Sequence, residues 1–138
     1  MSLQLNGYSI ESALLCEQIR QEIQNKVSIV GVFSSNIVVG QFPSTFPITI
    51  YLEIDAEVAG EIELNVKLIS PGSNRVEVKI MGEIALPGRS YIPMPAMPLV
   101  CDEPGPVTVE VSDGGEVWHT LIAREIQLGD IDGKTAVN

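Results

Sequence analysis

The chain has 138 residues, a length that fits one domain with its own hydrophobic core. Eighteen acidic residues against eight basic ones give a net charge of −10 and an isoelectric point near 4.4, which argues against nucleic acid and anionic membrane surfaces as partners. Hydrophobic residues make up 45% of the chain, which excludes disorder over its whole length. We therefore expect a single domain over residues 1–138, with 1–9 and 130–138 as frayed ends.

The compartment follows from what the sequence lacks. It shows neither a signal peptide nor an apolar stretch approaching the ~18 residues of a membrane span, so we expect a cytoplasmic protein. Cys16 and Cys101 are too few for a disulfide framework and too widely spaced for a metal motif. We expect two buried, reduced thiols, the alternative being a Cys16–Cys101 bridge.

Residues 10–24 fit two kinds of secondary structure. Leu15, Ile19 and Ile23 recur every four residues, as on the apolar face of a helix, and this spacing slightly favours a helix. Residues 10–16 also fit a short buried strand. After a turn at Asn25-Lys26, the nearly continuous apolar run 27–33 predicts a strand covered on both faces.

Three segments then alternate between apolar and polar residues: 48–58, 61–68 and 76–80, with Gly60 marking the turn between the first two. Phe42-Pro43 and Phe46-Pro47 precede them, as expected of prolines at strand starts and edges. Read as a meander of three neighbouring strands, the segments place Glu53 opposite Lys67, Lys67 opposite Glu77, and Asn65 opposite Lys79. We interpret these charges as a solvated, partly paired face rather than a carboxylate active site.

Six prolines fall between residues 87 and 106 and predict an extended crossing from one sheet to another. Within this segment, the run 93–98 (Pro-Met-Pro-Ala-Met-Pro) resembles a ligand for aromatic-lined grooves. Its apolar flanks favour packing against its own sheets instead.

The segment 104–129 predicts a hairpin, with Val107, Val109 and Val111 on one face of its first strand. A two-residue loop at Gly114-Gly115 would pair Val111 with Trp118 and direct Trp118 and Ile122 inward. A three-residue loop over 113–115 would direct His119 and Leu121 inward instead. Because Trp buries more apolar area, we predict Trp118 inside and His119 outside.

Together, at least seven strand signals at roughly ten-residue spacing predict an all-β fold, a two-sheet antiparallel sandwich of about seven to eight strands.

Few residues suggest chemistry. His119 is the only histidine, and a nucleophilic dyad would need Cys16 or Cys101 beside it. The tail 130–133 (Asp-Ile-Asp-Gly) resembles the start of a calcium loop, but the sequence lacks the acidic residue and second helix that would complete one. A looser calcium site would need loop oxygens converging at one end of the sandwich, from Asp102, Glu103, Asp113 or Asp55.

Several short motifs carry a resemblance to a known family: the run 13–20 (Ala-Leu-Leu-Cys-Glu-Gln-Ile-Arg), the run 30–33 (Val-Gly-Val-Phe), and Phe42-Pro43. They resemble the opening of a family of short bacterial and phage-associated proteins described only as a domain of unknown function. The runs 68–72 and 104–114 resemble its second half. This sequence departs from the pattern in lacking a glycine between Asn25 and Lys26.

The resemblance implies an immunoglobulin- or C2-like sandwich and a strand over residues 11–17, and we follow it there. It implies no catalytic residues. We expect a non-enzymatic module without a cofactor, which binds another protein or self-associates and does not bind nucleic acid or membrane. Such a module should show an exposed apolar patch or an available edge strand. The alternative is a calcium- or small-ligand-binding C2-like module.

Overall fold

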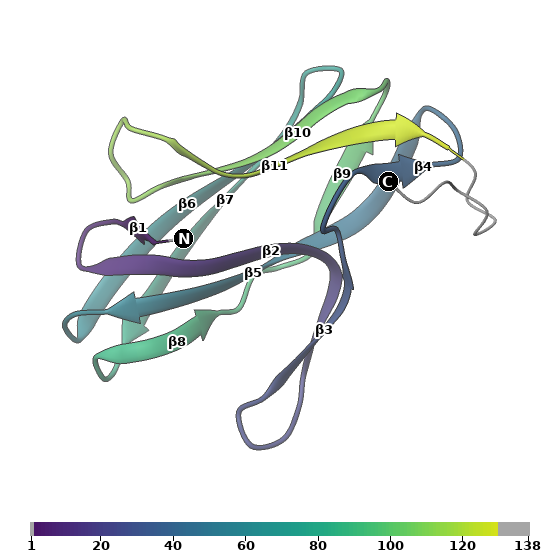
Figure 1. Ribbon diagram of the computed structural model, residues 1–138. Helices are drawn as coiled ribbons and strands as arrows, with labels where there is room; N and C mark the ends of the chain where they lie inside the picture. The colour runs from purple at the N-terminus through teal and green to yellow at the C-terminus, as the bar shows by residue number, and fades with distance from the viewer. Residues whose placement is uncertain (1, 130–138) are drawn as a thin grey trace.

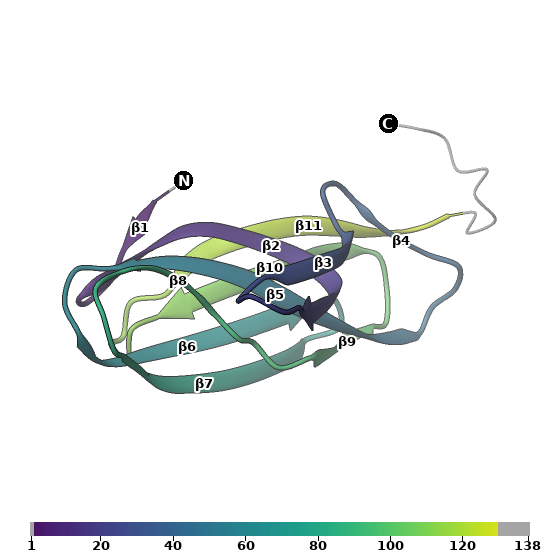
Figure 2. The same cartoon turned by 90° about the horizontal axis from the view of Figure 1, so that it is seen from below.

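The computed structural model describes residues 2–129, which form eleven strands in two sheets packed face to face (Figure 1). Figure 2 shows the long strands of both layers running along the same length of the molecule. The strands are β1 (Leu3–Gln4), β2 (Tyr8–Gln21), β3 (Val27–Val32), β4 (Ile37–Val39), β5 (Ser44–Ala56), β6 (Gly60–Ser70), β7 (Asn74–Ile84), β8 (Gly88–Ile92), β9 (Met97–Cys101), β10 (Gly105–Ser112) and β11 (His119–Leu128). The predicted all-β sandwich is confirmed.

In the first sheet, β2 and β5 lie at the centre. β1 and β3 pair with the free side of β2, and β8 and β9 pair with the free side of β5. The second sheet has the order β4-β11-β10-β6-β7, in which β4 runs parallel to β11. The structure thus has eleven strands rather than the predicted seven to eight, and its pairings are antiparallel except for that of β4 with β11. Strands as short as β1 and β4 carry too little alternation to be recognised.

The core lies between the two sheets and is built by alternation along the central strands. Ile48, Ile50, Leu52 and Ile54 of β5 are fully buried. They face the buried residues of the second sheet, which include Leu64, Val66, Leu68, Val107, Val109, Val111, Ile122 and Ile126. Full burial of such a side chain stabilises the fold by roughly 1.5–3 kcal/mol relative to exposure.

The predicted three-strand meander is wrong, because β5 and β6 belong to different sheets. β5 ends at Ala56, and the chain then passes from the first sheet to the second. Val58 lies in this connection and is 62% exposed. Glu53 therefore does not lie opposite Lys67. The second hairpin is as predicted, with Lys67 opposite Glu77 and Asn65 opposite Lys79. Alternation shows which side chains face the core, but two facing sheets show the same pattern as two neighbouring strands.

The last hairpin has a longer loop than predicted. Val111 pairs with His119, and a bulge after Val109 restores Ile122 to the core face. The ring of Trp118 lies outside the core, 3.9 Å from Nζ of Lys67. The prediction of Trp118 inside is therefore wrong, whereas Ile122 lies inside as predicted and His119 is half-buried. The Trp118 ring is covered by an outward-facing lysine instead, a favourable cation–π arrangement.

Three expectations for the N-terminal third are settled by β2 and β3. β2 is one long strand, so the strand implied by the resemblance is confirmed and the helix is not formed. Residues 3–9 are not frayed: Tyr8 is 1% exposed and its hydroxyl donates to the carbonyl oxygen of Glu63 at 2.9 Å. The run 27–33 is not covered on both faces, since β3 is half-buried to exposed.

The proline-rich segment is extended, as predicted. It forms β8 and β9 along β5 and then enters the second sheet as β10. Its Met97 is buried opposite Ile48, so the run 93–98 packs against its own sheet. Residues 2–129 include no helix long and apolar enough to cross a membrane.

Candidate protein-binding site

The first sheet divides into two ribbons at Cys16. Up to that residue β2 pairs with β5, and from there to Gln21 it pairs with β3 alone. On the N-terminal side of Thr49, from Ser44 to Ile48, β5 pairs with β9. We call residues 17–32, which comprise the end of β2, the connecting turn and β3, the arm. In Figure 1 the arm extends away from the rest of the sandwich.

The arm reverses direction at Gln24 and Asn25, whose φ values are 62° and 58°. Two successive left-handed residues form a turn whose twist matches that of a two-stranded ribbon. The N–H of Glu22 donates to the carbonyl oxygen of Lys26 at 2.8 Å and closes the turn. The turn predicted at Asn25-Lys26 is thus confirmed to within one residue.

The outer edge of β3 has no partner strand among residues 2–129. Its six residues contain neither a charge nor a proline, and Val30 and Val32 are 40% and 41% exposed. Unpaired backbone groups of an edge strand can hydrogen-bond an incoming strand, and proteins usually protect such edges with charges, prolines or shortness. β3 lacks this protection, so it is open to the addition of an extended segment.

The arm also differs from the rest of the chain in charge. Glu17 and Glu22 are balanced by Arg20 and Lys26, which leaves sixteen acidic and six basic residues to the remaining chain. The net charge of −10 therefore lies entirely outside the arm. A partner can approach β3 without meeting a local excess of either sign.

A polar network fixes the arm against the outer face of the first sheet. Nε2 of Gln21 donates to the hydroxyl oxygen of Tyr91. The Tyr91 ring stacks on Tyr51, with ring centroids 6.0 Å apart and planes inclined by 13°. The hydroxyl of Tyr51 donates to Glu53 at 3.0 Å, and Arg89 donates to Glu53 at 2.7 Å. Gln21 thus ties the arm to this network.

Two carboxylates in this network have lowered pKa values. Arg89 lies between them and also donates to Glu11 at 3.3 Å. The pKa of Glu53 is lowered by the hydrogen bond from Arg89 and then by that from Tyr51. The pKa of Glu11 is lowered by hydrogen bonds from Ser2 and Ser9, and further by the charge of Arg89. Both groups therefore favour the ionised form in the folded state.

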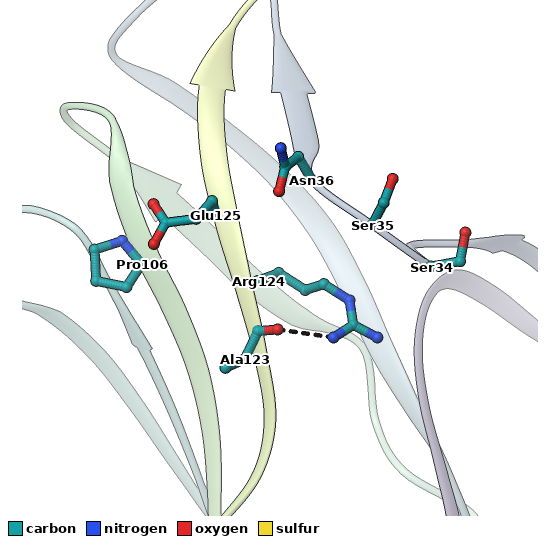
Figure 3. Close-up of a pocket in the computed structure, with 7 residues that line it drawn as sticks. All are labelled: Ser34, Ser35, Asn36, Pro106, Ala123, Arg124 and Glu125. Carbon is teal, nitrogen blue, oxygen red and sulfur yellow. Dashed lines mark hydrogen bonds between the residues drawn. The ribbon is translucent and has the colours of Figure 1, made fainter. Parts of the chain in front are cut away.

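Arg124 fixes the other end of the arm, where the chain crosses to the second sheet. Its Nε donates to the carbonyl oxygen of Phe33 at 2.8 Å, and its Nη1 donates to the carbonyl oxygen of Ala123 at 2.7 Å. Figure 3 shows this side chain reaching from β11 towards the crossing segment, while Glu125 points the other way. The shallow hollow around it, about 290 Å³, is bordered by Ser34, Ser35 and Asn36. We assign Arg124 a structural role.

A groove of about 360 Å³ lies at the base of the arm. Phe33 and Phe46 contribute an aromatic pair with centroids 6.4 Å apart, and Glu17 is the one carboxylate among the lining residues. The remaining lining residues are Ile37, Val38, Val39, Gly40, Ser44 and Pro47. Because Glu17 belongs to the arm and also lines the groove, the groove and the arm adjoin each other.

The four acidic residues proposed for calcium are not brought together. Asp102 and Glu103 precede β10 and Asp113 follows it, so they lie at opposite ends of a strand about 25 Å long. Asp102 accepts a hydrogen bond from Asn74 (3.0 Å), and Asp55 lies in the other sheet, opposite Arg89. No three His, Cys, Asp or Glu side chains within residues 2–129 form a group that could hold a metal ion. The tail 130–133 lies outside the described residues.

Cys16 and Cys101 are both buried and free. They pair with Thr49 and Ser44, on opposite sides of β5 and roughly 16 Å apart along it, so the alternative of a bridge between them is wrong. Burial raises the pKa of both thiols, that of Cys101 to about 11. Among the described residues no hydrogen bond joins either thiol to His119.

Sequence reasoning located β3 but missed its exposure. A nearly continuous β-branched run is typical of a strand covered on both faces. The absence of any charge or proline in residues 27–32 was the available signal, because that composition also describes an unprotected edge.

One comparison with known proteins is informative. No protein of curated function matches the chain. The model of the family of unknown function DUF6941 matches residues 11–124, a range that includes the arm, the groove, all of β5 and β2 from Glu11 onward. The chain therefore belongs to this family.

Proposed function

We propose that this protein is a non-enzymatic binding module that assembles with another polypeptide by adding an extended segment to the free edge of β3. The unprotected edge itself carries the proposal. Among residues 2–129, the strand Val27–Val32 pairs on one side only, with β2, and Gln21 ties the end of β2 to Tyr91. Strand addition gains affinity from main-chain hydrogen bonds and specificity from side-chain pockets.

The groove at the base of the arm supplies such a pocket. Its apolar walls and the carboxylate of Glu17 favour a side chain with an apolar stem and a positive end, such as lysine or arginine. The two buried, free thiols fit a reducing compartment, and we propose that the protein acts in the cytoplasm. The resemblance of its opening motif supports a bacterial or phage-associated assembly.

Site-specific photo-crosslinking in cells tests this proposal. A photoreactive amino acid is placed at Val32 on β3, or at Met81 on β7 as the matched control; both residues are exposed edge-strand positions. We expect discrete adducts from Val32 that disappear when Ser28→Lys and Val30→Lys are added, and none from Met81. Equal labelling at both positions, or no adduct from Val32, contradicts the proposal.

A further inference from the structure

We propose that the segment added to β3 is the β3 strand of a second copy of this chain, paired antiparallel about a twofold axis. This inference rests on the proposed function, because it names the partner of the same edge. The product is a symmetric dimer in which the two first sheets are joined through their arms.

The charge distribution makes the arm the least repulsive place for contact between two copies. Two bodies that carry the same large negative charge repel each other, and the arm is the part of the chain without net charge. The arm carries two acidic and two basic residues, so it adds no net charge of its own to the contact. Contact through the arms therefore joins two copies where their repulsion is weakest.

The sequence of β3 suits pairing with itself. In an antiparallel twofold arrangement centred between residues 28 and 30, the opposed residues are valines, isoleucine, serine and glycine. Lys26, the nearest charge, never comes opposite its own copy in these registers. Apolar β-branched pairs across strands are stabilising, whereas like charges directly opposite are destabilising. No charged pair obstructs the self-association of this edge.

The expected dimer is weak. A stable interface buries about 800 Å² on each partner, and a six-residue strand with its immediate neighbours provides less. We therefore expect reversible dimerisation that depends on protein concentration. Added salt should strengthen it slightly, because salt screens the repulsion between the two negatively charged bodies.

Sedimentation velocity of the full chain, from about 1 to about 500 μM, provides the first test. We expect the average mass to rise from that of a monomer towards twice 14.9 kDa. A mass that stays at the monomer value throughout overturns the inference. If the purified chain is monomeric while Val32 crosslinks to a different protein, the proposal of strand addition to β3 is supported. Only the inference that the partner is a second copy is then wrong.

A charge exchange provides the second test. Ser28→Lys with Val30→Lys places lysines against lysines across the twofold axis, and we expect the dimer dissociation constant to rise at least tenfold. Ser28→Glu with Val30→Glu should do the same, and an equimolar mixture of the two variants should restore dimers. Failure of the mixture to associate contradicts pairing of β3 with itself.

The matched control is Val58→Lys with Leu86→Lys, which adds the same charge at two exposed positions outside the strands. It should dimerise like the wild type. Circular dichroism establishes that each variant is folded, and Val30→Lys alone replaces any double variant that is not. A lysine variant of the arm that is folded and dimerises as the control does refutes the inference.

Discussion

β3 and β7 each form the outer edge of a sheet, but their exposed residues differ. β7 carries four exposed charged side chains: Arg75, Glu77, Lys79 and Glu83. β3 carries none, and its valines are exposed in their place. Charges along an edge oppose pairing with a foreign strand, so β7 is protected and β3 is available. The two edges of one fold thus differ in the charge that they present to a neighbouring strand.

The largest effect on stability should come from Gly31 on β3, whose backbone conformation favours glycine, whereas that of Gly82 on β7 does not. Gly31 has a φ of 67°, and a Cβ there would lie 2.5 Å from Oε1 of Glu17. Because Glu17 is exposed and can move, the backbone conformation should dominate the cost of Gly31→Ala, about 1–2 kcal/mol. Chemical denaturation measures this difference.

The corresponding control is Gly82→Ala on β7, where nothing lies within 4 Å of the added carbon. It should leave stability unchanged or raise it slightly, because alanine reduces the freedom of the unfolded chain. Equal losses of unfolding free energy from Gly31→Ala and Gly82→Ala would show that β3 does not need glycine more than β7 does.

Removing the protection of β7 should make the edges more alike. Glu77→Val with Lys79→Val replaces two outward charges by the kind of residue that β3 exposes. We expect the association constant of the protein with itself to increase about tenfold, a change of about 1.4 kcal/mol in the free energy of association. Light scattering over a concentration series measures it, with Glu77→Gln and Lys79→Gln as the polar control. Unchanged scattering would mean that charge is not what protects β7.

The turn of the arm allows a gain in stability. Gln24 adopts a left-handed backbone that glycine adopts without steric cost. Gln24→Gly should therefore stabilise the protein by about 0.5–1 kcal/mol. The same substitution at Gln18, within β2, should destabilise it, as glycine does inside a strand. Thermal unfolding of the two variants should give shifts of opposite sign.

The smallest expected effect concerns pH. The pKa values of Glu53 and Glu11 are lowered in the fold, so their contribution is present at neutral pH and is lost as pH falls below the ordinary value of about 4.5. Arg89→Gln should make the fall in melting temperature between about pH 5 and pH 3 shallower. Arg75→Gln on β7 is the control. A decline as steep as the wild type's would show that Arg89 does not lower the pKa of Glu53.

The sequence by itself determined the fold class and most of the strands. Alternation at Ile48 to Ile54 and at Val107 to Val111 identified core faces correctly, because burial of every second residue is local to one strand. It also placed Lys67 opposite Glu77, since a short hairpin fixes its own register.

Only the tertiary structure decided which strands are neighbours, and therefore where an edge lies free. The separation of β5 from β6, the long loop before His119 and the departure of β2 from β5 at Cys16 all depend on how two sheets close over one core. An uncharged strand such as Val27–Val32 has one composition whether it is covered or exposed. Its position at the edge of a sheet makes it a candidate binding surface, because burial and pairing are properties of the assembled fold.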